Sequence, residues 1–404
     1  MSKENIVVGL EIGTSKVCVV VADVRPDGSL KVLGVGQSPS LGVRKGEIVH
    51  LESVHKCVRD AIADAEQKSD VSIRRAYVAI TGGHIASFNN RGVVELPEGR
   101  EEIDEDDLEE AKRVAREVNI PSQNAFLHAI IQHYYVDGQD GVLTPVGMLG
   151  HKLEADYHIV HGVRTRIQNI IRCVKDIPLE VQDVVLNSLA SAQVIVSQNQ
   201  KNLGVLVIDI GGGTLDYLLY VDGAVKQSGV LAVGGDHLTS DISLGLRIPL
   251  GRAERLKIDE GSAVLGNCLP GETIYLQPEP GFAGREVERE TLNSIIHFRL
   301  REAFELLKRQ LESEPHLRYL GAGAVLTGGC SLLHGINHLA EEILGLPVQP
   351  AQPPPLQGVT SALSNPQLST ALGLIKYAQF SQMEQPEPTL WSRLRGLFGR
   401  RRAR

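Results

Sequence analysis

Two short glycine-containing segments carry the side chains best placed to do chemistry in this chain. The first reads GLEIGTSK, close to the start, and the second reads VIDIGGGTLDY, near the middle. In each of them an apolar run leads to an acidic residue, an isoleucine and a glycine, and small or polar residues then precede another apolar run. The pattern aligns Glu11 with Asp209 and Gly13 with Gly211. It predicts two strand–turn–strand hairpins from two related parts of the chain.

Turns of this composition are suited to binding phosphate. Glycine lets the backbone approach a ligand because no Cβ stands in the way, and successive N–H groups of a turn form a concave site for anionic oxygens. Either turn alone would read as an ordinary hairpin, but two matched turns facing one cleft can hold the phosphates of one nucleotide from both sides. The predicted phosphate contacts are Gly13, Thr14, Ser15, Lys16, Gly211, Gly212, Gly213 and Thr214.

The carboxylates that precede the two turns suggest a metal ion. Glu11 and Asp209 would lie near the floor of the cleft, where they could hold Mg²⁺ largely through its water ligands or position a water molecule for catalysis. Mg²⁺ suits such a site because it accepts few protein ligands and keeps several waters. The alternative role for both side chains is local hydrogen bonding to the backbone N–H groups of their own turns.

Three further segments could hold the rest of a nucleotide. The loop in LTGGCS would pass beside a flat base and open a helix whose N–H groups are available, and VGGDHLTSD places another Gly-Gly turn before a helix. In GRAERLKI, Glu254 and Lys257 share one helix face and could bind ribose hydroxyls, or could form a solvated surface ion pair instead. The predicted contacts in these segments are Gly234, Gly235, Glu254, Lys257, Gly328, Gly329 and Cys330.

Alternating strand and helix patterns must position these turns. The run HLESVHKCVRDAIADAEQKS has its apolar residues on one helical face, and RRAYVAITG reads as a short buried strand. The segment from 84 to 162 differs in texture, with an acidic amphipathic helix between strand-like runs, and reads as a small lobe inserted into the first half. Near residue 203 the organisation starts again with the second hairpin. We therefore expect two similar α/β halves that face each other.

Composition sets further limits. The chain of 404 residues has 42% hydrophobic and 22% charged residues, as expected for a folded protein of two or three domains. It contains no run of about 18 apolar residues, so we expect no membrane-spanning helix, and its start does not read as a signal peptide. Five widely spaced cysteines are expected to be reduced, buried thiols in the cytosol. A formal net charge of −8 argues against nucleic acid as the main partner.

The last segment, LWSRLRGLFGRRRAR, contrasts with this acidic body. It carries six arginines and no acid, so the rest of the chain has a formal charge of −14. Helical spacing places its apolar residues on one stripe with arginines beside and after it, which predicts a reversible in-plane anchor on an anionic membrane. A terminal helix docked on the protein's own core is the alternative. The predicted membrane contacts are Leu390, Trp391, Arg393, Leu394, Arg395, Leu397, Phe398, Arg400, Arg401 and Arg402.

These segments together resemble the ATPase superfamily of actin, the sugar kinases and the heat-shock chaperones. GLEIGTSK and VIDIGGGTLDY resemble its two phosphate motifs, AVLTGGCSLLHGI its adenosine motif, and LNSLASAQV and STALGLIKYA its connecting segments. Within the superfamily the chain most resembles the FtsA family of bacterial cell-division proteins, over essentially its full length. The extra lobe follows the fourth predicted strand, as in FtsA, and Glu11 stands where most of the superfamily has an aspartate.

The resemblance implies an α/β, actin-like two-lobed fold with the nucleotide between the lobes. It implies duplicated RNase-H-like mixed sheets, the small inserted lobe of FtsA and a C-terminal amphipathic helix. The expected domain boundaries are residues 1–83, 163–197 and 369–380 for the first half, 84–162 for the inserted lobe, 198–368 for the second half with a small lobe at about 236–312, 381–389 for a flexible linker and 390–404 for the membrane-targeting helix.

The same resemblance implies a function in cell division. ATP and Mg²⁺ would be bound, with at most weak ATPase activity. The protein would polymerise with itself on the cytoplasmic face of the inner membrane at the division site, anchor filaments of FtsZ there, and recruit later divisome proteins through the inserted lobe. Two alternatives with the same fold are a pilus-assembly adaptor and a small-molecule kinase, although we find no kinase-specific motif.

The resemblance also places the FtsZ C-terminal peptide in the small lobe of the second half. Arginines of GREVERETLNSIIHFRLREAF could pair there with an acidic peptide, or they could be ordinary solvated helix charges. The predicted peptide contacts are Arg285, Arg289, Arg299 and Arg301.

Overall fold

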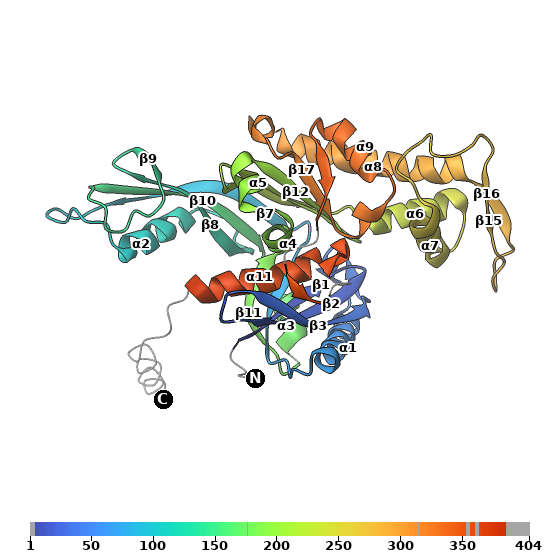
Figure 1. Ribbon diagram of the computed structural model, residues 1–404, viewed down its shortest axis with the longest axis horizontal. Helices are drawn as coiled ribbons and strands as arrows, with labels where there is room; N and C mark the ends of the chain where they lie inside the picture. Colours follow the sequence, from blue (N-terminus) through green and yellow to red (C-terminus); the bar gives the residue numbers. More distant parts are fainter. Residues whose placement is uncertain (1–4, 176, 313–314, 353–355, 360–362, 385–404) are drawn as a thin grey trace.

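The computed structural model shows two α/β halves and a third sheet that projects from them (Figure 1). The residues that it describes are 5–175, 177–312, 315–352, 356–359 and 363–384. No helix among these residues is both long enough and apolar enough to cross a membrane. Every tail residue predicted to contact a membrane lies outside the described residues.

A six-stranded mixed sheet forms the centre of the first half, in the order β11-β6-β1-β2-β3-β19. β1, β2 and β3 are joined in antiparallel pairs, whereas β6, β11 and β19 are added in parallel pairs. β1 and β2 are buried along nearly all of their length, as expected when helices cover both faces of a sheet. The strands are Ile6–Ile12 (β1), Lys16–Val24 (β2), Leu30–Pro39 (β3), Arg75–Ile80 (β6), Glu180–Leu186 (β11) and Gln357–Gly358 (β19).

Four helices pack against this sheet. α1 contacts α3, and α4 contacts α11, which also packs on β1 and β2. The predicted apolar stripe of α1, including Val54, Val58 and Ile62, is buried, and this confirms the helix and its orientation. The helices are α1 (Leu51–Ser69), α3 (Arg164–Lys175), α4 (Asn187–Ile195) and α11 (Ser369–Glu384), and a short hairpin, β4 (Val43–Arg44) with β5 (Glu47–Ile48), precedes α1.

Helix α11 ends later than the sequence predicted. We placed a flexible linker from residue 381, but the helix continues to Glu384. Residues 381 to 384 contain no proline or glycine, and the first proline of the segment is Pro386. Nothing in these four residues therefore interrupts the helical hydrogen bonds.

The second half repeats the first half's sheet except for β19, which has no counterpart there. Its sheet has the order β14-β13-β12-β17-β18, again with an antiparallel meander on one side and parallel pairs on the other. This duplication confirms the two related α/β halves. The strands are Val205–Ile210 (β12), Leu215–Val221 (β13), Ala224–Leu231 (β14), Ala324–Thr327 (β17) and Val348–Pro350 (β18).

Helices and a small hairpin complete the second half. α6, α7 and α8 pack together beyond the sheet and form, with β15 and β16, the small lobe expected near 236–312 (Figure 1). The elements are α5 (Gln198–Leu203), α6 (Gly235–Leu246), α7 (Leu250–Glu260), β15 (Thr273–Leu276), β16 (Arg285–Glu288), α8 (Arg289–Leu311) and α9 (Ile336–Leu344), with short 3₁₀ helices at Pro315–Tyr319 (η1), Gly329–Leu332 (η2) and Pro366–Leu368 (η3).

The inserted lobe is a four-stranded antiparallel sheet with one helix on it. Its strand order is β7-β10-β8-β9, and α2 packs on β7 and β10 over a small apolar core of its own. Asp104 caps α2 in a capping box with Asp107, which fixes the start of the helix. The elements are β7 (Ile85–Glu95), α2 (Glu105–Arg116), β8 (Asn124–Val136), β9 (Gln139–Val142) and β10 (Lys152–Val163).

Candidate functional site

The two predicted glycine turns form equivalent hairpins. In the β1–β2 hairpin Glu11 pairs across the strands with Cys18, and in the β12–β13 hairpin Asp209 pairs with Asp216. Each turn is closed by one bond of the same length: Gly13 N–H donates to the Lys16 carbonyl, and Gly211 N–H to the Thr214 carbonyl, both at 2.9 Å. The sequence alignment of the two segments is therefore also a structural equivalence.

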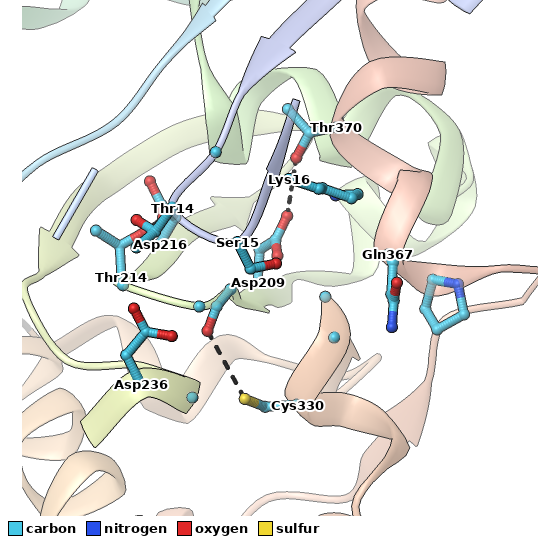
Figure 2. A pocket seen from close by; sticks show the side chains of 18 of the residues that line it. Thr14, Ser15, Lys16, Asp209, Thr214, Asp216, Asp236, Cys330, Gln367 and Thr370 are labelled. Atoms are coloured by element: carbon cyan, nitrogen blue, oxygen red, sulfur yellow. Dashed lines mark hydrogen bonds between the residues drawn. The ribbon is translucent and has the colours of Figure 1, made fainter. Parts of the chain in front are cut away.

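The two turns face each other across one cleft between the halves (Figure 2). A Cβ built on Gly212 would lie only 3.1 Å from the Ser15 Cβ of the opposite turn. A Cβ on Gly213 would overlap the Thr14 hydroxyl and lie 2.8 Å from the Lys45 Cα. Glycine is required here because the turns approach too closely for side chains.

All predicted phosphate, ribose and base contacts except one line this cleft. The exception is Gly234, which packs behind the second turn: a Cβ there would lie 2.7 Å from the carbonyl oxygens of Gly211 and Gly212. The predicted residues that line the cleft are Glu11, Gly13, Thr14, Ser15, Lys16, Asp209, Gly211, Gly212, Gly213, Thr214, Gly235, Glu254, Lys257, Gly328, Gly329 and Cys330.

The first carboxylate is balanced within its own hairpin. The Lys16 ammonium lies 3.4 Å from both oxygens of Glu11, and both side chains are largely buried. Burial raises the pKa of Glu11, although Lys16 opposes the effect. For Lys16, burial is the largest single influence and favours the neutral amine, but the combined attraction of Glu11, Cys18 and Asp209 raises the pKa of Lys16 overall.

The second carboxylate is held by hydroxyl groups from the first half. Asp209 Oδ2 accepts hydrogen bonds from Ser191 Oγ on α4 at 2.7 Å and from Thr370 Oγ1 on α11 at 3.1 Å. Burial raises the pKa of Asp209, while the two hydroxyl donors and Lys16 oppose the shift. The expected alternative, bonding of Asp209 to its own turn, is not what these contacts show.

A third carboxylate, Asp216, was missed by the sequence reading. It is 2% exposed and accepts from Thr81 Oγ1 at 2.5 Å and from Thr214 Oγ1 at 2.8 Å. Burial raises the pKa of Asp216 to about 7, with the Thr81 bond opposing and Asp209 reinforcing the shift. Its signal in the sequence was an acidic residue inside the apolar strand LDYLLYV, because burying a carboxylate is costly unless it has hydrogen-bond partners.

Three carboxylates therefore lie along the floor of the cleft, two of them cross-strand neighbours. Among the described residues no group of three or more His, Cys, Asp or Glu side chains could hold a metal ion directly. The donor set fits Mg²⁺ bound largely through water, as predicted for Glu11 and Asp209, because hydrated Mg²⁺ needs few protein ligands.

Glu254 and Lys257 form an ion pair in which the lysine side chain is buried and the glutamate side chain is 43% exposed. Lys257 is 6% exposed and donates to Glu254 Oε2 at 2.6 Å, to Thr239 Oγ1 at 3.0 Å and to the Gly235 carbonyl at 3.2 Å. Its three protons are thus used within the protein. Lys257 therefore holds Glu254 against the cleft wall and leaves Glu254 Oε1 available to a ligand.

The loop predicted to pass a base lines the wall of the cleft next to Lys257: a Cβ on Gly235 would lie 3.0 Å from Cys330 Sγ and 3.3 Å from Lys257 Nζ. Gly328 has φ 85°, and a Cβ there would meet the Ile210 carbonyl at 2.5 Å. We expected this turn to open a helix, but only the 3₁₀ turn η2 follows it, and α9 begins at Ile336 after Gly335. Residues near this wall that the sequence did not indicate are Ile258, Leu332, Leu333, Pro366 and Gln367.

The four arginines predicted to bind a peptide differ in their partners. Arg289 donates to Glu260 and Glu272, both at 2.6 Å, and Arg299 donates to Asp241 at 2.5 Å. Arg301 donates to Glu342 at 2.7 Å. Arg285 has no carboxylate partner among the described residues, where its guanidinium donates a hydrogen bond to the Arg247 carbonyl at 3.4 Å. An acidic peptide would have to compete for the first three.

Family models and curated relatives identify the chain. Residues 206–373 match the family model for cell division protein FtsA, and residues 82–161 match the model for the SHS2 domain inserted in FtsA. The FtsA of Pseudomonas aeruginosa is 38% identical over 94% of this chain and 90% of its own length. The chain belongs to the FtsA family of cell-division proteins. The FtsA proteins of Neisseria meningitidis and Escherichia coli K12 are 37% and 35% identical over 94% of this chain and 91% of their own lengths.

Solved structures confirm an actin-like fold for this FtsA-family chain. A chain of the PilM–PilN type IV pilus biogenesis complex matches with a TM-score of 0.66 and 17% identity, over 92% of this chain and 98% of its own. MreB5 of Spiroplasma citri bound to ADP matches with a TM-score of 0.56 and 16% identity, over 95% of this chain and 99% of its own. At these identities the likeness concerns the fold alone, whereas the relatives place the chain with FtsA rather than with pilus adaptors or kinases.

Proposed function

We propose that this FtsA-family protein binds ATP with Mg²⁺ in the cleft between its halves. The observation that carries this proposal is the close approach of the two glycine turns, which leaves backbone N–H groups and the hydroxyls of Thr14, Ser15 and Thr214 around one space. Lys16 adds a positive charge, and Glu11 with Asp209 would bind the hydrated metal ion. MreB5 of Spiroplasma citri has been solved bound to ADP and to AMPPNP, which supports a nucleotide for this fold.

The bound nucleotide would favour polymerisation on the cytoplasmic face of the inner membrane. Each subunit carries a tail whose apolar stripe and arginines suit an anionic lipid surface, although that tail lies outside the described residues. One such anchor binds weakly and reversibly. A polymer presents many anchors at once, so the effective concentration of each at the membrane rises and binding becomes strong.

The polymer would anchor FtsZ filaments and assemble the division machinery. An acidic FtsZ C-terminal peptide would bind the small lobe of the second half, where Arg285 is the predicted arginine still free of a carboxylate partner among the described residues. The inserted lobe projects away from both sheets and offers a surface for neighbouring subunits and later divisome proteins (Figure 1).

Sedimentation with liposomes tests this function. The intact chain and a version ending at Gln385 would be spun with anionic liposomes, with and without ATP–Mg²⁺ and an FtsZ tail peptide. We expect the intact chain to pellet, more completely with ATP, and to carry the peptide down, whereas the truncated version stays in the supernatant with its peptide. Equal pelleting of both versions would remove the anchor from the proposal, and unchanged pelleting on addition of ATP would contradict nucleotide-driven polymerisation.

A further inference from the structure

The root of the inserted lobe touches the second turn through one side chain. Thr81 follows β6 directly, and the inserted lobe begins after it, at the turn of Gly82 and Gly83. The Thr81 hydroxyl donates to one oxygen of Asp216 at 2.5 Å, while the Thr214 hydroxyl donates to the other at 2.8 Å. Asp216 thus accepts one bond from each half of the molecule. Both Thr81 and Asp216 are buried, so water does not compete for the bond.

Close packing leaves this contact little freedom. Gly46, in the turn of the β4–β5 hairpin, lies against the methyl groups of both threonines: a Cβ there would be 2.9 Å from Thr81 and 3.1 Å from Thr214. The Gly46 N–H also donates to Thr14 Oγ1 of the first turn at 3.1 Å. Interiors packed this tightly transmit displacement instead of absorbing it. A shift of the second turn must therefore move Thr81 as well.

A second set of bonds joins the inserted lobe to the second half along β14. Ser87 Oγ donates to the Ser228 carbonyl at 2.8 Å, and Asn89 Nδ2 donates to the Lys226 carbonyl at 2.9 Å. β14 is itself paired with β13, the strand that holds Asp216. The inserted lobe is thus covalently part of the first half, but it is hydrogen-bonded to the second half along β14, and Thr81, directly before the lobe, bonds to the same half at Asp216.

We propose that Thr81 is a positioning residue that fixes Asp216 at the nucleotide cleft and transmits nucleotide binding to the inserted lobe. The proposal rests on the ATP binding proposed above. A triphosphate held by the second turn draws on the hydroxyl of Thr214, which now bonds to Asp216. The carboxylate then depends on Thr81, and any shift of Asp216 pulls on the residue from which the inserted lobe starts. Gly82, at φ 137°, is the point where the backbone can turn in response.

The consequence concerns the partners of the inserted lobe. A lobe whose angle follows the occupancy of the cleft presents its outer surface differently in the two nucleotide states. Binding energy passes in both directions between coupled sites, so a partner on the inserted lobe would change ATP affinity by the same factor as ATP changes affinity for that partner.

Replacing the Thr81 hydroxyl in the full-length protein tests the coupling. Thr81→Val keeps the branched shape and removes the donor, Thr81→Ala removes it without any risk of overpacking, and Thr81→Ser is the matched control that keeps it. Two quantities would be measured: the affinity for a fluorescent ATP analogue, and the hydrogen exchange of residues 85–95 with and without ATP. In the wild type we expect ATP to change the hydrogen exchange of residues 85–95. We expect the Val and Ala variants to bind ATP about tenfold more weakly, as for the loss of one hydrogen bond to a buried carboxylate.

The outcomes separate this inference from the function on which it rests. Loss of the ATP-dependent exchange change in the Val and Ala variants at saturating ATP, with recovery in Thr81→Ser, supports the coupling. The proposal would be overturned if ATP changed the hydrogen exchange of residues 85–95 in the Val and Ala variants as much as in the wild type. It would also be overturned if the wild type bound ATP without any change in the hydrogen exchange of these residues. A wild-type protein that binds no ATP would instead contradict the proposed function itself.

Discussion

The first and second glycine turns share one scaffold but balance their buried charge differently. Both are closed by the same backbone bond, and both place an acidic residue at the same register position. In the first hairpin Lys16 neutralises Glu11 from within the turn. The second hairpin contains no basic residue between Val205 and Val221. Its two aspartates accept hydrogen bonds from hydroxyl groups of the other half, those of Thr81 just after β6, Ser191 on α4 and Thr370 on α11.

This difference shows how a duplicated fold becomes an asymmetric site. The first turn is self-contained, so it can form whatever the position of the other half. If the halves separated, Asp209 would lose both of its hydroxyl donors and Asp216 one of its two, and buried polar groups without partners are costly. The hydroxyl–carboxylate bonds of the second turn are therefore the contacts through which a nucleotide can influence the angle between the halves.

Of the changes considered, a side chain at position 213 should have the largest effect on the close approach of the two glycine turns. Gly213→Val places atoms where the Thr14 hydroxyl and the Lys45 backbone lie, and it forces the turns apart. We expect ATP affinity to fall at least a hundredfold, about 3 kcal/mol, from overpacking in a site with no room to relax. Titration calorimetry measures it. Gly211→Ala is the control, since its Cβ would be 3.6 Å from the Thr214 carbonyl, an ordinary contact; equal losses in the two variants would contradict the close approach.

The contrast in charge balance predicts unequal stability losses. Lys16→Met leaves Glu11 buried beside no cation and should cost about 2 kcal/mol, because an unpaired buried charge is penalised heavily. Asp209→Asn should cost less than about 1 kcal/mol, since Ser191 and Thr370 can donate to the amide oxygen as they do to the carboxylate. Urea unfolding without nucleotide compares them. A larger loss for the Asp209 variant would show that the second hairpin, not the first, relies on charge.

The raised pKa of Asp216, in the second hairpin, predicts that the stability of the protein depends on pH. The pKa of Asp216 is raised by burial to about 7, so the folded state holds the proton more tightly than the unfolded chain. The stability that this gives is complete below the unfolded pKa and is lost as pH rises through about 7. We expect the nucleotide-free protein to lose about 1 kcal/mol of this contribution between pH 6 and pH 8. Thermal unfolding of wild type and Asp216→Asn should show the difference, and identical pH profiles for the two would refute the assignment.

The fold was largely predictable from the sequence because its signals are local. The repeated pattern around Glu11 and Asp209 revealed the duplication, and apolar periodicity located α1 and both hairpins. The errors lie at element ends, where local signals are weak. α11 continues to Glu384 because its last turn contains no proline or glycine, and the loop after β17 closes as a 3₁₀ turn rather than opening a helix.

The site was predictable only as far as its motifs. Each glycine turn can be recognised from a motif of about eight residues. Thr81, Ser191 and Thr370 are instead single hydroxyl residues that the fold brings to the aspartates of the cleft from distant parts of the chain. Ser191 and Thr370 lie within LNSLASAQV and STALGLIKYA, which resemble connecting motifs, but nothing in those segments singled out the two hydroxyls as partners of Asp209, and Thr81 lies in no such motif. Burial also could not be read locally: Lys257 looks like a surface lysine in sequence, and it is covered because α6 packs on α7.

One cross-linking measurement tests the central claim, that both turns grip a single nucleotide. A Cβ on Gly212 lies 3.1 Å from the Ser15 Cβ, close to the separation of about 3.5–4.5 Å in a disulfide. Ser15→Cys combined with Gly212→Cys, with the partly exposed Cys268 replaced by serine, should oxidise rapidly to a bridged form without nucleotide. We predict that saturating ATP–Mg²⁺ slows this bridge at least tenfold because the phosphates lie between the two turns. A bridge that forms equally fast with ATP bound would contradict that claim.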